Sequence, residues 1–210
     1  MRPKTMDNTQ VFAIREISES ERAFKRFMDI FLCILFAPFA IILIALAYIT
    51  TKISSTGPAI FKQTRVGLKG KVFEIYKIRT MLHNPNGYID HTKENDNRIT
   101  KLGLILRKTK IDELPQLYNV LKGDMSIVGP RPERTHIVEE YKKQSDYYQY
   151  RHLVKPGITG WAQVNKPMAT PEENLEKLEY DLFYINNYSL KLDMKILART
   201  FDVVKKGESL

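Results

Sequence analysis

The segment KTKIDELPQ, residues 108–116, places two carboxylates side by side at the expected start of a helix. Asp112 is suited to cap that helix, Glu113 falls in its first turn and Pro115 lies just inside it. Acidic residues satisfy free N–H groups and the helix dipole there, so a purely structural role is one interpretation. The other is chemical, because adjacent carboxylates can bind Mg²⁺ shared with substrate phosphates, and one of them can attack phosphorus as a nucleophile.

Cationic side chains elsewhere in the chain could complement these carboxylates. Arg131 stands between two prolines in GPRPE, and a guanidinium on a stiff turn can grip phosphate in a fork. Lys77 and Arg79 point to the same face of an expected strand. Arg107 precedes Asp112 by five residues. For each cation the alternative is a solvated surface charge, an ordinary ion pair or a helix-end charge meeting the dipole.

An uncharged run, IFLCILFAPFAIILIALAYI at residues 30–49, must be placed relative to this chemistry. Twenty helical residues are about 30 Å long, which matches the hydrocarbon core of a bilayer. Pro38 removes a helical hydrogen bond, so we expect two helical arms meeting near Ala37 and Pro38. Lysine and arginine flank both ends of the run, whereas a span favours positive charge on the cytoplasmic side. A transmembrane span and a re-entrant hairpin both remain open on these features.

Arg26 and Asp29 lie at the edge of the apolar run, three residues apart on one expected helix face. They could form an ion pair, or both could extend into the lipid headgroups. The run is not expected to be a cleaved signal peptide, because about thirty polar and charged residues precede it and no small-residue cleavage motif follows.

Composition limits the classes of partner and compartment. The 210 residues carry a net charge of +9, and the isoelectric point is about 9.5. This balance favours an anionic partner, which can be nucleic acid, anionic lipid or a phosphorylated substrate. The single cysteine, Cys33, excludes a disulfide framework and fits a reducing compartment.

Hydrophobic periodicity predicts an α+β fold. Residues 59–67 and 71–80 alternate apolar and polar side chains and predict a β-hairpin. Thr100 is expected to cap a helix through about Arg107. Residues 112–123 predict a helix ended by Gly123, whose apolar stripe consists of Leu114, Leu117, Tyr118 and Leu121. Further predicted elements are a loop at 83–97, a strand and stiff turn at 126–133, a helix at 132–143, loop and strand at 155–167, and helices at 170–189 and 190–207.

Three segments, taken together, resemble a known family. FKQTRVGLKGKVFEIYKIRTM, RKTKIDELPQLYNVLKGDMSIVGPRPE and KPGITGWAQV follow, in this order, a KR-x-x-D apolar run with a central proline. The chain is similar to bacterial sugar transferases over roughly residues 22–205. More closely, it resembles the monotopic phosphoglycosyl transferases, which move a sugar-1-phosphate from a nucleotide sugar to polyprenyl phosphate.

The resemblance implies a role for each candidate residue. Asp112 would attack the β-phosphorus of a UDP-sugar, UMP would leave, and polyprenyl phosphate would then take the phospho-sugar from Asp112. Glu113, beside Asp112, would hold Mg²⁺. Arg107 and Arg131 would bind phosphate. The remaining two candidates, Lys77 and Arg79, would contact the nucleotide or diphosphate.

The resemblance also implies a location and a domain plan. It favours an N-terminal arm at 1–21, a re-entrant membrane helix-break-helix at 22–52 and a cytoplasmic catalytic domain at 53–210. The expected site is the cytoplasmic face of a bacterial inner membrane, with membrane lipids as partners, no nucleic acid and homo-oligomerisation left open. The family usually has Ser-Pro at the break, whereas this chain has Ala37-Pro38. Alanine cannot satisfy a backbone group that proline frees, which puts the depth of the bend in question.

A different class of function also fits part of the sequence. A non-catalytic, membrane-anchored basic adaptor that binds anionic lipid or nucleic acid would explain the net charge and the apolar run. It would not explain adjacent carboxylates between two arginines, or the stiff GPRP turn. The residue pattern does not indicate which sugar donor or glycan pathway is used.

Overall fold

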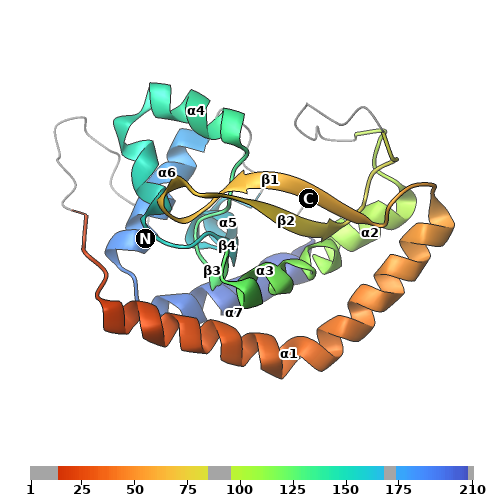
Figure 1. Cartoon of the computed structure of the whole chain (residues 1–210), viewed down its shortest axis with the longest axis horizontal. Helices are drawn as coiled ribbons and strands as arrows, with labels where there is room; N and C mark the ends of the chain where they lie inside the picture. Colours follow the sequence, from red (N-terminus) through yellow and green to blue (C-terminus); the bar gives the residue numbers. More distant parts are fainter. Residues whose placement is uncertain (1–13, 85–95, 168–173, 208–210) are drawn as a thin grey trace.

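A computed structural model describes residues 14–84, 96–167 and 174–207 of the chain (Figure 1). The described part combines helices with two small sheets, which confirms the α+β class. The elements are α1 (Glu19–Ser54), β1 (Ile60–Val66), η1 (Leu68–Gly70), β2 (Val72–Ile78), α2 (Lys101–Lys108), η2 (Ile111–Glu113), α3 (Gln116–Lys122), β3 (Ser126–Val128), α4 (Thr135–Gln144), η3 (Asp146–Leu153), β4 (Gly157–Thr159), α5 (Trp161–Asn165), α6 (Asn174–Asn186) and α7 (Leu190–Lys206), where η marks a 3-10 helix.

Two strand pairs organise the domain. β1 and β2 form the predicted antiparallel hairpin, in register from Ile60 opposite Ile78 to Val66 opposite Val72. β3 and β4 are separate short strands in sequence, but they pair in parallel, with Ser126 opposite Gly157. The sequence placed strands near both positions without indicating that they pair. The parallel pair brings the GPRP turn beside the KPGITG segment.

α1 is one helix of 36 residues, begun by a capping box between Ser18 and Glu21. The sequence predicted two arms separated by a break, but the helix continues through Pro38 and its ribbon bends near the middle (Figure 1). Proline can bend a helix without ending it, because only one hydrogen bond is lost. α1 is long and apolar enough to cross a membrane, and only 17% of its most apolar 18-residue window is buried. Such a surface fits membrane anchoring.

The N-terminal part of α1 is tied to the rest of the domain. Arg26 donates hydrogen bonds to the carbonyl oxygens of Val120 (2.5 Å) and Leu121 (2.7 Å), at the end of α3. The predicted Arg26–Asp29 ion pair is therefore wrong. Asp29 instead lies 3.1 Å from Lys25, one helical turn earlier. The orphan carbonyls at a helix end explain the choice, because they accept the guanidinium N–H groups.

The C-terminal end of α1 is tied to the same domain through the hairpin. Arg79, just after β2, donates to the carbonyl of Ser55 (2.9 Å), the hydroxyl of Ser55 (3.0 Å) and the carbonyl of Thr56. Cys33 packs with Ile75, Val120 and Met125, and Ala47 packs with Ile78 and Leu106. α1 therefore contacts one domain at both of its ends and along its inner face.

α2 and α3 follow the sequence prediction in position but not in orientation. Thr100 caps α2 by accepting from the N–H of Gly103 (2.9 Å), and Gly123 ends α3 with φ = 97°. The predicted apolar stripe of α3 faces outward only in part. Tyr118 and Leu121 are 59% and 45% exposed, whereas Leu117 packs against the cluster that contains Cys33 and Val120. The buried side combines the apolar Val120 with Gln116 and Asn119, and the side-chain amide of Asn119 donates to the carbonyl of Glu74 on the hairpin (2.7 Å).

The main core lies among α4, α6, α7, η3 and the β3–β4 pair. Its most deeply buried members are Tyr148, Leu182, Tyr184, Ile185 and Ile196. The helices predicted at 132–143, 170–189 and 190–207 correspond to α4, α6 and α7. Most of the arm predicted at 1–21 and of the loop predicted at 83–97 lies outside the described residues.

Candidate active site

The two carboxylates lie in η2, between α2 and α3. Lys110 immediately before them adopts a left-handed conformation with φ = 57°, and the N–H of Glu113 bonds back to its carbonyl (3.1 Å). The prediction that Asp112 caps a helix is wrong, since α3 begins after Pro115 without a side-chain cap. The carboxylates are thus not used to satisfy a helix end.

Glu113 is buried between two cations that reach it from different elements. Its Oε1 lies 2.6 Å from Lys77 Nζ on β2 and 3.3 Å from Arg131 Nη2 after β3. Burial alone would raise the pKa of Glu113, but the charges of Lys77 and Arg131 outweigh it and hold the pKa well below its usual range. Glu113 is therefore an ionised carboxylate with one oxygen held in place.

Asp112 is buried beside Glu113 but is bonded differently. Among the described residues, its Oδ1 has no hydrogen-bond partner. Burial raises the pKa of Asp112, while the charges of Lys77, Lys110 and Arg107 oppose that rise. A buried carboxylate oxygen without a partner costs free energy, and such atoms in native structures mark sites that act on something else.

The structure brings together three of the four cations predicted to serve the site. Lys77 and Arg131 contact Glu113, and Arg107, through Nε, donates to Thr80 Oγ1 (2.9 Å) while its charge acts on Asp112. Arg79 is not placed with them, because its guanidinium faces the end of α1. On an alternating strand Lys77 and Arg79 were expected to share a face, but β2 ends at Ile78 and the alternation ends with it.

Lys110 is a member of this cluster that the sequence analysis did not select. Burial lowers the pKa of its ammonium group, and the charges of Glu113 and Asp112 oppose that change. A lysine rarely adopts positive φ, since its Cβ crowds the backbone at a cost of about 1–2 kcal/mol. The residue type of Lys110 predicts neither its left-handed conformation nor its place in the site. Its position two residues before Asp112 was the one signal in the sequence.

Arg131 is held by a rigid backbone platform. The N–H of Gly129 donates to the carbonyl of Thr159, and the N–H of Gly157 donates to the carbonyl of Pro130, both at 2.9 Å. Arg151 adds a third support by donating to the carbonyl of Arg131 (2.8 Å). This platform fixes the direction in which the guanidinium points toward Glu113.

Gly129→Ala should damage this platform. A Cβ at position 129 would lie inside the van der Waals radii of the backbone at Lys155 and Gly157, which cannot move like a side chain. We expect a loss of about 2–3 kcal/mol in the free energy of unfolding, with a parallel loss of activity. Gly70→Ala is the control, because its φ of 77° costs about 1 kcal/mol while nothing lies near its Cβ. Equal melting temperatures for the two variants would contradict the platform.

The site offers few acidic ligands for a metal. No group of three or more histidine, cysteine, aspartate or glutamate side chains in the described ranges could hold an ion. Both cations contact Oε1 of Glu113, which leaves its Oε2 and the carboxylate of Asp112 for a ligand. Mg²⁺ commonly takes one or two carboxylates and completes its shell with substrate phosphate and water. The residues therefore fit a magnesium ion that arrives with a phosphorylated substrate.

Comparison with known proteins matches this arrangement to a family. The family of bacterial sugar transferases matches residues 20–207, which include α1, the hairpin, both carboxylates and the platform. The chain belongs to the bacterial sugar transferase family. Membership agrees with the resemblance read from the DELPQ, GPRP and KPGITGW segments.

Several named proteins are similar to this bacterial sugar transferase, and two of the names specify a UDP-sugar and undecaprenyl phosphate. Over 87% of its own length, the chain is 41% identical to a UDP-N-acetylgalactosamine-undecaprenyl-phosphate N-acetylgalactosaminephosphotransferase of Aeromonas hydrophila. It is 42% identical over 88% of its length to a UDP-glucose:undecaprenyl-phosphate glucose-1-phosphate transferase of Escherichia coli. The chain spans only 44% and 40% of these relatives. It spans 92% of exopolysaccharide production protein PSS of Rhizobium leguminosarum, at 39% identity over 86% of its own length.

Proposed function

We propose that the protein transfers a sugar-1-phosphate from a UDP-sugar to polyprenyl phosphate, as the first membrane step of a bacterial glycoconjugate or exopolysaccharide pathway. The observation that carries the proposal is the buried, unpartnered Oδ1 of Asp112 within a cluster of cations. The names of relatives that use undecaprenyl phosphate support the substrate classes.

The proposed reaction has two displacements at one phosphorus atom. The carboxylate of Asp112 attacks the β-phosphorus of the UDP-sugar, the bond from that phosphorus to the bridging oxygen breaks, and UMP leaves with the oxygen. A phosphate oxygen of the polyprenyl phosphate then attacks the same phosphorus. The Asp112–phosphorus bond breaks, polyprenyl-diphosphate-sugar is released and the carboxylate is restored.

The neighbouring charges have distinct proposed roles. Lys77 and Arg131 fix Glu113 and, with Arg107 and Lys110, stabilise the negative charge that spreads over the phosphoryl oxygens in the transition state. Glu113 Oε2, with Asp112, would hold Mg²⁺, which neutralises diphosphate charge when it is bound. We assign Arg79 to anchoring the end of α1 rather than to the nucleotide, since its guanidinium bonds are already made there.

The membrane location is the second part of the proposal. The outward apolar faces of α1 and α3 favour a domain lying on the bilayer, on the cytoplasmic side of the inner membrane where nucleotide sugars are found. α1 is tied to the domain at Arg26 and again at Ser55, so a straight crossing that put its ends on opposite sides would pull it from the domain. A re-entrant helix bent at Pro38 keeps both ends on one face.

Labelling of the two termini tests this topology. We expect cysteines introduced beyond both ends of the described chain, in a Cys33→Ala background, to resist a membrane-impermeant thiol reagent in intact cells. Both should react after the membrane is permeabilised, which controls for burial. Labelling of only one terminus in intact cells would show that α1 crosses the membrane and would exclude the re-entrant arrangement.

The covalent intermediate provides the direct test of the reaction. The purified protein is incubated with a UDP-sugar and Mg²⁺ but without polyprenyl phosphate, digested and analysed by mass spectrometry. We expect a sugar-phosphate adduct on the peptide that contains Asp112, with one UMP released per adduct. A preparation that makes product while this peptide stays unmodified would overturn the mechanism. An adaptor without catalysis would release no UMP from any donor, and a panel of UDP-sugars would define the sugar.

A further inference from the structure

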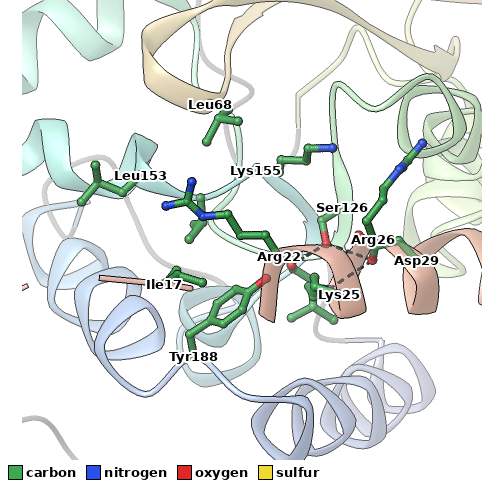
Figure 2. A pocket seen from close by; sticks show the side chains of 12 residues that line it. Ile17, Arg22, Lys25, Arg26, Asp29, Leu68, Ser126, Leu153, Lys155 and Tyr188 are labelled. Atoms are coloured by element: carbon green, nitrogen blue, oxygen red, sulfur yellow. Dashed lines mark hydrogen bonds and ion pairs between the residues drawn. The ribbon is translucent and has the colours of Figure 1, made fainter. Parts of the chain in front are cut away.

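A basic hollow lies at the N-terminal end of α1 (Figure 2). It is separate from the site that contains Asp112 and Glu113. Its volume is about 520 Å³, part of it open to solvent. The hollow and the carboxylate site lie at opposite ends of α3, because Arg26 contacts the carbonyls that end α3 whereas Asp112 precedes its start. The charged residues lining it are Arg22, Lys25, Arg26, Asp29 and Lys155.

The one carboxylate in this lining, Asp29, is held through one of its two oxygens. Asp29 accepts hydrogen bonds from the hydroxyl of Ser126 and the N–H of Ile127, both at 3.0 Å, and it pairs with Lys25. Lys25 also lies 3.1 Å from Asp193, so its charge is compensated twice. Asp29 therefore supplies one negative charge against the four cations of the lining.

The remaining three cations form no ion pair with the described residues. Arg26 donates only to carbonyl groups, and Arg22 and Lys155 form no side-chain hydrogen bond or ion pair with the described residues. The end groups of Lys155 and Arg26 lie 3.7 and 3.8 Å from the point that a Cβ on Gly123 would occupy, so two like charges share a small space. Burial and the charge of Arg26 lower the pKa of Lys155, and the carboxylates of Asp29 and Asp124 only partly oppose that change. An anion in this space would relieve that repulsion.

The rest of the hollow is apolar and adjoins the membrane-facing helix. Leu68, Leu153 and Val154 contribute to its wall, and a low-dielectric wall strengthens the attraction of an anion for the cations. On α1, Phe24 and Phe27 are 51% and 62% exposed, on the side of the helix turned away from Arg22 and Arg26. The hollow therefore lies at the end of α1 where the exposed apolar surface of this helix begins.

We infer that this hollow binds the phosphate group of an anionic phospholipid through Arg22, Arg26 and Lys155. Figure 2 shows Arg22 and Arg26 rising from α1 on the side where Lys155 lies. Guanidinium and ammonium groups form strong charge-assisted hydrogen bonds to phosphate. A free phosphate has the same chemistry, but Leu153, in the wall of the hollow and 40% exposed, supplies an apolar contact that only the lipid can use.

A titration of the full-length protein tests this site. The protein in non-ionic detergent is titrated with short-chain phosphatidylglycerol, and the rise in melting temperature gives an apparent Kd. Phosphatidylcholine provides the background, and inorganic phosphate provides the free anion. We expect Arg22→Gln combined with Lys155→Gln to weaken phosphatidylglycerol binding about thirtyfold, since each cation near a headgroup contributes about a factor of five.

The matched control is Lys142→Gln combined with Lys143→Gln. It makes the same change of charge on α4, which lies on the other side of the molecule from α1 (Figure 1), and it should leave lipid binding unchanged. Equal affinity of the wild type and the hollow variant for phosphatidylglycerol would overturn the site. Equal affinity of the wild type for inorganic phosphate and phosphatidylglycerol would overturn the assignment to lipid. The assay uses no sugar nucleotide, so its outcome is independent of the proposed function.

Discussion

Asp112→Asn should abolish the release of UMP from UDP-sugars, by at least about 10⁴-fold. The amide is close in shape to the carboxylate but cannot form an acyl phosphate. The loss should be one of chemistry alone, because Oδ1 of Asp112 makes no hydrogen bond within the described residues. Burial already disfavours the charge at this position, so we expect the melting temperature to be retained or slightly raised.

The experiment compares activity and melting temperature in one preparation. Asp146→Asn, at an exposed position, makes the same chemical change and should alter neither quantity. UMP release near the wild-type rate by the Asp112 variant would exclude this carboxylate as the nucleophile. Loss of activity together with a large fall in melting temperature would also count against the assignment, because it would indicate a structural role.

Glu113→Gln should have the second largest effect, and it should act on both stability and activity. Glu113 is the carboxylate that Lys77 and Arg131 share at 2.6 and 3.3 Å. Removing its charge leaves a buried ammonium without its counter-ion, which typically costs about 3–5 kcal/mol. We expect a lower melting temperature, at least about a 100-fold fall in activity and a shift of the Mg²⁺ titration to higher concentration.

Two further variants separate these effects. Glu176→Gln removes a surface carboxylate that pairs with Lys166 at 2.8 Å, and it should cost no more than about 1 kcal/mol. Combining Glu113→Gln with Lys77→Met removes both members of the buried pair and should recover most of the stability without recovering activity. If the Mg²⁺ dependence of activity were unchanged in Glu113→Gln, Glu113 would not be a ligand of the metal ion.

Local signals made part of this structure predictable. The alternating pattern of the hairpin, the Thr100 cap and the glycine after α3 are set by neighbours in sequence, and each was confirmed. The carboxylate pair and the cations Lys77, Arg107 and Arg131 were selected because their residue types suit phosphate chemistry. The structure then placed these residues together.

The errors share a different cause, which is that the partner lies far away in sequence. Arg26 finds the end of α3 rather than Asp29, and Arg79 finds the end of α1 rather than the site. The stripe with Tyr118 and Leu121 was correctly periodic, but periodicity does not indicate whether an apolar face meets a protein core or lipid. The strain at Lys110 depends on a turn that its residue type does not signal.

The way α1 packs means that it cannot be removed as a separate module. Its Cys33 fills a cluster with Ile75 and Val120, and its Ala47 fills another with Ile78 and Leu106. A truncated chain without α1 would open both clusters to water and release the carbonyls that Arg26 holds. Efforts to obtain a soluble catalytic fragment should therefore exchange the outward apolar side chains of α1 and keep the helix itself.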